Sequence, residues 1–228
     1  GGAPAMRPEC EASVWAQDYG GGIVREVGTF NPWPGLDHRN VLAQYERARE
    51  LFLESDCGAL LTLEHDVVLP ADGLTRLVEG LGRLDYSFGL TPAGEHPGVV
   101  FGVYMLRHGS KVLNAWEYVG DNGMGESLSL NAGKLREARR AGRVRVSGVG
   151  WGCTLSRREV VEAVRFRDGG GENPAGDIAF AMDCLYRGVV MIADFDVACD
   201  HFDGELRLRP FGGAMNDSVA VVALQDVT

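Results

Sequence analysis

Two acidic side chains and one histidine follow apolar segments of the sequence and are candidates for a metal site. The apolar run 59–63 leads directly into Glu64 and Asp66, and His201 lies beyond a second predicted strand at 189–193. Carboxylates at alternate positions of an extended chain point the same way. Two of them suit a hard divalent cation that also holds a substrate diphosphate. The alternatives are a solvated acidic turn and a structural histidine.

Asp177 is a fourth candidate, because it begins a predicted helix over 177–187 that ends before Gly188. Taken alone, an aspartate at a helix start is most simply an N-cap or a partner of the helix dipole. Its order relative to Asp66 and His201 is what makes the combination informative. The chain also contains 32 glycines, which indicates many tight loops, as at sites where backbone approaches a ligand.

Apolar periodicity predicts the elements that must position these residues. Short apolar runs alternate with amphipathic segments, which indicates an α/β fold with a mostly parallel sheet. The predicted helices are 39–55, 71–84 and 177–187, with a capping box at Ser156–Glu159. The predicted strands are 59–63, 99–107, 144–149 and 189–193.

The C-terminal segment 218–225 is strongly apolar and predicts a strand in the middle of a parallel sheet. Met215 precedes it and resembles a start of translation. We therefore hypothesise a circular permutation, in which residues 1–228 form one domain and its natural first strand stands last. The alternative is an ordinary C-terminal strand with an incidental methionine.

Composition excludes several classes of protein. The 228 residues carry 22 Lys and Arg against 32 Asp and Glu, a net charge of −10, which argues against nucleic-acid partners and a basic membrane surface. Five cysteines without a C-x-x-C pair argue against a disulfide framework and indicate a reducing compartment. No apolar run approaches the roughly 20 residues of a membrane helix, and no signal peptide is visible. The predicted location is cytoplasmic.

With these motifs in view, the sequence resembles the nucleotide-sugar glycosyltransferases of the GT-A fold, in particular the large inverting family with DxD, Glu-Asp and C-terminal His motifs. Leu60–Pro70 resembles the DxD strand, with Glu64 in place of the first Asp. Gly176 and Asp177 resemble the Glu-Asp pair, with glycine in place of Glu. The resemblance implies a Rossmann-like, mixed and mostly parallel central sheet flanked by helices.

The resemblance also implies a function. A metal-dependent transferase would move a sugar from a nucleoside-diphosphate sugar to a hydroxyl of a carbohydrate or other acceptor, with inversion. Asp66, His201 and Glu64 would hold Mn²⁺ or Mg²⁺, and Asp177 would act as general base. The further residues implied for donor binding are Glu64, Arg39, Thr228, Pro4, Met6, Arg7, Gly150 and Trp151. Trp151 is a candidate to stack on a sugar, with a core aromatic as the alternative.

Two other functions remain open from the sequence. A sugar-nucleotide pyrophosphorylase should carry a glycine-rich loop with Arg and Lys after its first strand. Reading from Asp226 through Thr228 into Gly1 and on to Arg7 gives one Arg and no Lys. A non-catalytic carbohydrate- or nucleotide-binding domain of the same fold is the third possibility, and the missing Glu beside Asp177 supports it.

Overall fold

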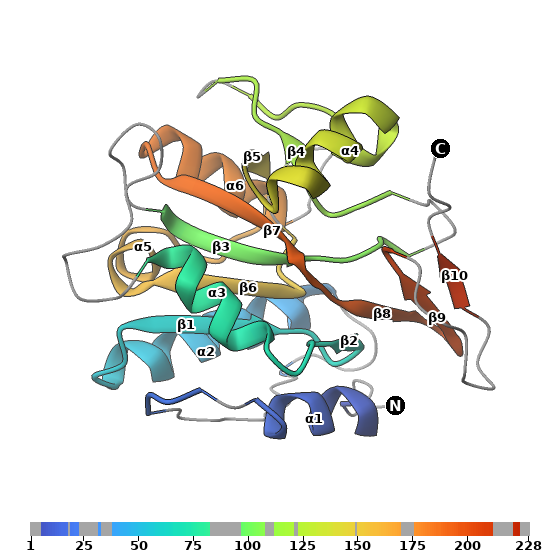
Figure 1. Cartoon of the computed structure of the whole chain (residues 1–228). Helices are drawn as coiled ribbons and strands as arrows, with labels where there is room; N and C mark the ends of the chain where they lie inside the picture. The colour runs from blue at the N-terminus through green and yellow to red at the C-terminus, as the bar shows by residue number, and fades with distance from the viewer. Residues whose placement is uncertain are drawn as a thin grey trace.

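The central feature of the fold is a sheet with helices on both faces and a smaller sheet at one end (Figure 1). The computed structural model describes residues 6–17, 19–22, 32, 38–82, 97–107, 112–120, 123–148, 150–169, 176–211 and 221–223. No helix in these ranges combines the length and apolar character needed to cross a bilayer.

The helices are α1 (Pro8–Trp15), α2 (His38–Glu54), α3 (Gly73–Leu81), η1 (Leu128–Leu130, 3₁₀), α4 (Ala132–Ala141), α5 (Arg158–Ala163) and α6 (Gly176–Tyr186). The strands of the central sheet are β1 (Ala59–Leu63), β3 (Pro97–Val103), β4 (Trp116–Glu117), β5 (Arg143–Gly148), β6 (Cys153–Arg157) and β7 (Val190–Ala198). The strands of the smaller sheet are β2 (Val67–Val68), β8 (Asp200–Asp203), β9 (Leu206–Arg209) and β10 (Val221–Ala223).

The fold has the helix and sheet layers of an α/β protein, but the strands of its central sheet are mostly antiparallel. Its order is β1-β6-β3-β7-β5-β4, and among these described strands only β3 and β7 pair in parallel. The prediction of a mostly parallel sheet was therefore wrong. An apolar run shows that both faces of a strand are buried, but it does not give the strand's direction. The segment read as a capping box around Ser156 is instead the end of β6, and α5 begins after it without a side-chain cap.

The segment predicted as a central strand lies elsewhere. Within 218–225, the described residues 221–223 form β10, which pairs in parallel with β9 at the edge of the smaller sheet. The prediction of a central strand was wrong, because the apolar pattern does not say which sheet a strand joins. The circular-permutation hypothesis relied on that central position and loses this support.

Two hydrophobic cores fill the two faces of the central sheet. On one face α3 packs against β3 and β7 through Leu77 and Leu81, which are fully buried. On the other face α6 contributes Phe180 to a core with Phe101 of β3. Helices α2 and α5 lie on the same face of the sheet as α6 (Figure 1). Strand β3 is buried along its whole length between these cores. Close packing on both faces therefore fixes the position of β3 and of the chain segment that follows its carboxyl end.

Pairing between β2 and β8 brings together segments that are far apart in the sequence. Their antiparallel register places Val67 opposite His201, and the Phe202 amide donates to the Asp66 carbonyl at 2.9 Å. The turn after β1 and the strand that continues β7 therefore run side by side. This junction between the two sheets fixes the backbone of the candidate site.

Gly176 begins α6 at a crowded position that explains why it carries no side chain. A Cβ built there would lie 2.8 Å from Leu42 Cδ2 and would overlap the Trp151 indole. We expect Gly176→Ala to destabilise the fold by about 1–3 kcal/mol, because the added methyl overpacks the core. Urea denaturation should show this loss. Gly123→Ala, at a site with open space around the Cβ, should leave the unfolding midpoint unchanged.

Candidate metal centre

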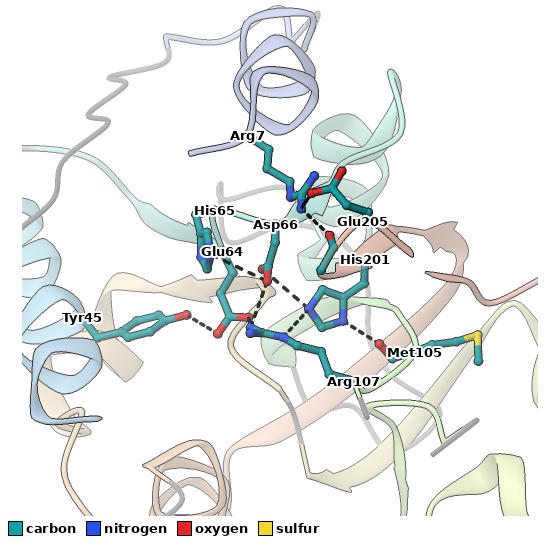
Figure 2. Close-up of polar contacts among 10 residues, drawn as sticks. Arg7, Tyr45, Glu64, His65, Asp66, Met105, Arg107, His201 and Glu205 are labelled. Carbon is teal, nitrogen blue, oxygen red and sulfur yellow. Dashed lines mark hydrogen bonds and ion pairs between the residues drawn. The ribbon is translucent and has the colours of Figure 1, made fainter. Parts of the chain in front are cut away.

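Glu64, Asp66 and His201 converge at the junction of the two sheets (Figure 2). Each offers one ligand atom, and these atoms lie within 4.8 Å of one another. Asp66 Oδ1 is 3.6 Å from His201 Nε2. The predicted candidates therefore lie in one place, and this Glu-Asp-His group could hold a metal ion.

Backbone hydrogen bonds hold the acidic turn in place. The Glu64 amide donates to the Gly152 carbonyl at 3.0 Å, and the Val67 amide donates to the Glu64 carbonyl at 3.2 Å. The Arg7 amide donates to the His65 carbonyl at 3.0 Å. Contacts from two distant segments, together with one bond within the turn, therefore orient the carboxylates of Glu64 and Asp66 before any ion binds, which is the supporting arrangement that a metal site requires.

One hydrogen bond sets the tautomer of His201. Its Nδ1 lies 2.6 Å from the Met105 carbonyl oxygen, which can only accept, so Nδ1 carries the proton. The Nε2 lone pair then points toward the carboxylates (Figure 2). A histidine that donates from one ring nitrogen to a carbonyl and offers the other to an ion is the usual arrangement in metal sites.

Asp66, one of the two most buried candidate ligands, has a carboxylate oxygen without a hydrogen-bond partner among the described residues. Asp66 is 4% exposed and His201 is 2% exposed. Asp66 Oδ1 is fully buried and has no hydrogen-bond partner among the described residues. A buried carboxylate oxygen left unpaired costs free energy. A cation at this position would remove that cost, and two oxygens with one imidazole nitrogen suit a divalent transition ion.

The two carboxyl groups respond to the site in opposite directions. Burial, followed by the charge of Asp66, raises the pKa of Glu64. Burial also pushes the pKa of Asp66 upward, but the nearby His201 and the Arg107 charge outweigh it and hold that pKa below its ordinary value. Asp66 therefore ionises more readily than Glu64 and is the better ligand.

Arg107 is a site residue that the sequence interpretation missed. It follows β3, and its guanidinium lies 3.1 Å from Asp66 Oδ2 and 3.7 Å from Glu64 Oε2. A signal was present, since Arg107 is the last residue of the predicted strand 99–107, at the sheet end where Asp66 was expected. Arginines are usually solvated, so nothing in the local pattern distinguished this one.

Asp177 begins α6 and is not one of the three candidate ligands. Its Oδ1 accepts the Ile178 amide at 2.9 Å within the first turn of α6. Burial raises its pKa. Burial, followed by the charge of Glu64, raises the pKa of Tyr45, whose hydroxyl donates to Glu64 Oε1 at 3.3 Å. The charge of Asp177 adds a smaller contribution to that shift.

Trp151 packs in the core, which is the alternative that the sequence left open for it. It is 5% exposed, and its ring lies 4.4 Å from that of Tyr45 and 5.2 Å from that of Phe166, centroid to centroid. Both contacts bury the ring. Gly150 is also buried, and its carbonyl accepts the Thr154 hydroxyl at 2.7 Å. These residues support the turn that holds Glu64.

The other predicted donor-binding residues are not among the three candidate ligands. Arg7 is anchored, because its guanidinium donates to the Gly204 carbonyl and lies 4.3 Å from the Phe202 ring centroid. Met6 precedes it and is half-buried, and Arg39 is exposed on α2. Pro4 and Thr228 fall outside the described residues.

Tyr45 supports Glu64, and its hydroxyl can be tested alone. We expect Tyr45→Phe to weaken Mn²⁺ binding by about threefold to tenfold, the value of one hydrogen bond to a charged group. Without that bond the pKa of Glu64 rises further, so a larger share is protonated. Calorimetric titration with Mn²⁺ should show the loss, and it should shrink as the pH is raised. An unchanged affinity at every pH would remove Tyr45 from the site.

Comparison with known proteins assigns no family to the chain. No protein-family model and no curated protein matches the chain. Solved structures do match, among them one titled "Crystal Structure of A197 from STIV", with 21% sequence identity and a TM-score of 0.49. That match covers 74% of this chain and 71% of the other. We base no assignment of function on it.

Proposed function

We propose that this protein is a metal-dependent glycosyltransferase that moves a sugar from a nucleoside-diphosphate sugar to an acceptor hydroxyl. One observation carries the proposal. Glu64, Asp66 and His201, which the sequence places where the resembled family has its metal motifs, bring their ligand atoms within 4.8 Å of one another.

In this proposal Asp66 and His201 are the principal ligands, and Glu64 lies toward the ribose or a water of the ion. Mn²⁺ suits two carboxylates and one imidazole better than Mg²⁺ does, because an imidazole favours transition ions. The ion supplies neutralisation of the charge that develops on the leaving diphosphate. The protein contributes a largely buried set of ligands whose atoms lie within 4.8 Å of one another.

Asp177 is the proposed general base. It removes the proton from the acceptor hydroxyl while that oxygen attacks the anomeric carbon, and a single in-line displacement inverts the configuration. Burial raises the pKa of Asp177, which makes it a stronger base than an exposed aspartate. The donor's nucleoside is proposed to lie on the side of Arg39, Met6 and Arg7, with Pro4, Thr228 and Gly150 as further contacts.

Two measurements test the proposal. Thermal shift with a panel of nucleoside diphosphates should show stabilisation by one nucleotide, and only when Mn²⁺ is present. The matching nucleotide sugar should then release that diphosphate in the presence of an acceptor. Release of pyrophosphate from a nucleoside triphosphate and a sugar phosphate would instead indicate a nucleotidyltransferase.

A non-catalytic binding domain is the second candidate, and Gly176 favours it. The Trp151 indole leaves no room for the acidic side chain that the resembled motif carries there. Such a domain would bind nucleotide with Mn²⁺ yet release no diphosphate from any nucleotide sugar. The turnover assay therefore separates the two candidates.

A further inference from the structure

The Arg107 guanidinium contacts every member of the candidate metal group. Its Nε lies 3.1 Å from His201 Nε2, one terminal nitrogen lies 3.1 Å from Asp66 Oδ2, and the same nitrogen lies 3.7 Å from Glu64 Oε2 (Figure 2). One arginine thus bridges three side chains that come from both sheets. It supplies a positive charge where the ion of the proposed function would supply one.

The chemistry of His201 makes these two cations exclusive. Because Nδ1 donates its proton to the Met105 carbonyl, Nε2 holds the only lone pair available in the ring plane. The Nε–H group of Arg107 uses that lone pair. A metal ion on His201 would need the same lone pair, so this hydrogen bond must break before the ion can bind.

Arg107 also has a route out of the site. Its side chain is 38% exposed, whereas those of Asp66 and His201 are 6% and 3% exposed. The ligands are therefore fixed in the junction between the sheets, and the arginine enters it from the solvent side. A guanidinium freed beside the site would present a fork of donors suited to phosphate oxygens.

We propose that Arg107 is a displaceable counter-cation, which neutralises Glu64 and Asp66 in the metal-free protein and is released to bind diphosphate when a metal ion takes its place. This inference rests on the metal site of the proposed function and adds a coupling to it. Metal binding frees the arginine for the phosphates, and phosphates that hold the arginine leave the site open for metal. The two ligands should therefore strengthen each other's binding beyond their direct contact.

Mn²⁺ affinity measured without any nucleotide tests the first half of the proposal. Calorimetric titration or Mn²⁺ electron paramagnetic resonance would compare the wild-type protein with Arg107→Met, which keeps the length of the side chain and loses its charge. We expect the variant to bind Mn²⁺ at least about tenfold more tightly, because a charge-assisted hydrogen bond no longer has to be broken. Arg47→Met is the matched control, since Arg47 is an exposed arginine that pairs with Glu50 on α2. Its affinity should equal that of the wild type.

Inorganic pyrophosphate tests the second half. In the wild type, saturating Mn²⁺ should tighten pyrophosphate binding, and in Arg107→Met this enhancement should fall by about tenfold or more. Arg107→Lys, which keeps the charge without the fork, should restore part of it. Thermal denaturation of each variant confirms that it is folded.

The outcomes separate failure of this inference from failure of the proposed function. Wild-type protein that binds Mn²⁺ through Asp66 and His201, together with an Arg107→Met variant of equal or weaker affinity, would overturn the inference alone and make Arg107 a positioning residue. No binding of Mn²⁺ by either protein would overturn both. Binding by Arg107→Met but not by the wild type would support the inference in its strongest form.

Discussion

Asp66→Asn is expected to weaken Mn²⁺ binding by at least about a hundredfold and to abolish metal-dependent stabilisation by nucleotide. Asp66 is the most buried acid of the candidate group, and its Oδ1 has no hydrogen-bond partner among the described residues. An amide offers a cation only a neutral oxygen, so the substitution removes the charged ligand. Calorimetric titration with Mn²⁺ measures the loss directly.

The unfolding stability of Asp66→Asn gives a second test of the same residue. The pKa of Asp66 is below its ordinary value in the folded protein, so its ionised form stabilises the fold at neutral pH. This contribution disappears as the pH falls through that lowered pKa. Metal-free Asp66→Asn should therefore unfold more easily than the wild type at pH 7, with a difference that narrows in acid.

A control separates the ligand role from a general effect of charge. Glu79→Gln removes an exposed carboxylate on α3 that pairs with Arg143 at 3.7 Å, away from the three candidate ligands. It should leave Mn²⁺ affinity unchanged. If Asp66→Asn binds Mn²⁺ as tightly as this control, Asp66 is not a ligand.

Asp177→Asn should reduce turnover by about 10²- to 10⁴-fold, the usual contribution of a general base, and leave Mn²⁺ affinity close to that of the wild type. Asp177 lies at the start of α6, outside the group whose ligand atoms lie together. Asparagine keeps an oxygen for the Ile178 amide, so the helix start is retained. Steady-state kinetics and metal titration of the same preparation separate the two effects.

The pH profile gives a further check on Asp177. Its pKa is raised by burial, so the base is protonated and inactive at a pH where an exposed aspartate would still be ionised. The acid limb of kcat/KM should therefore lie above the ordinary range of an aspartate. Because the folded pKa is the higher one, the ionised group destabilises the fold at neutral pH, and Asp177→Asn should be at least as stable as the wild type there. Full activity of this variant would remove Asp177 as the base.

The sequence predicted local elements better than their arrangement. Strand 59–63 was predicted with the bounds observed for β1, and helix 39–55 differs from α2 by one residue at each end. Gly188 has a φ of +70° and ends the α6 segment as expected. These features depend on periodicity and on glycine's freedom at positive φ, which a single segment reveals.

The direction of a strand and the sheet it joins could not be predicted from a single segment. The antiparallel placement of β6 between β1 and β3 depends on contacts between distant segments. The edge position of β10 depends on β9, which was not predicted. An apolar segment predicts that a strand is buried, but it does not predict which strands will pair with it.

The candidate metal group followed from chemistry that the sequence does display. Glu64 and Asp66 were identified from their position after an apolar run, and His201 from its place beyond another. Arg107 and the Met105 carbonyl were missed, because one is a common surface residue type and the other is backbone. The sequence left the role of Trp151 open, since its burial depends on Tyr45 and Phe166, which are distant in the chain.

Anomalous diffraction at the manganese edge, from crystals equilibrated with Mn²⁺, tests the central claim most directly. We predict one strong peak at about 2.0–2.3 Å from an Asp66 carboxylate oxygen and from His201 Nε2, with the Arg107 guanidinium withdrawn from the imidazole. Glu64 should lie close enough to contact the ion or one of its waters. Manganese bound elsewhere, with Arg107 still bridging Asp66 and His201, would contradict the account.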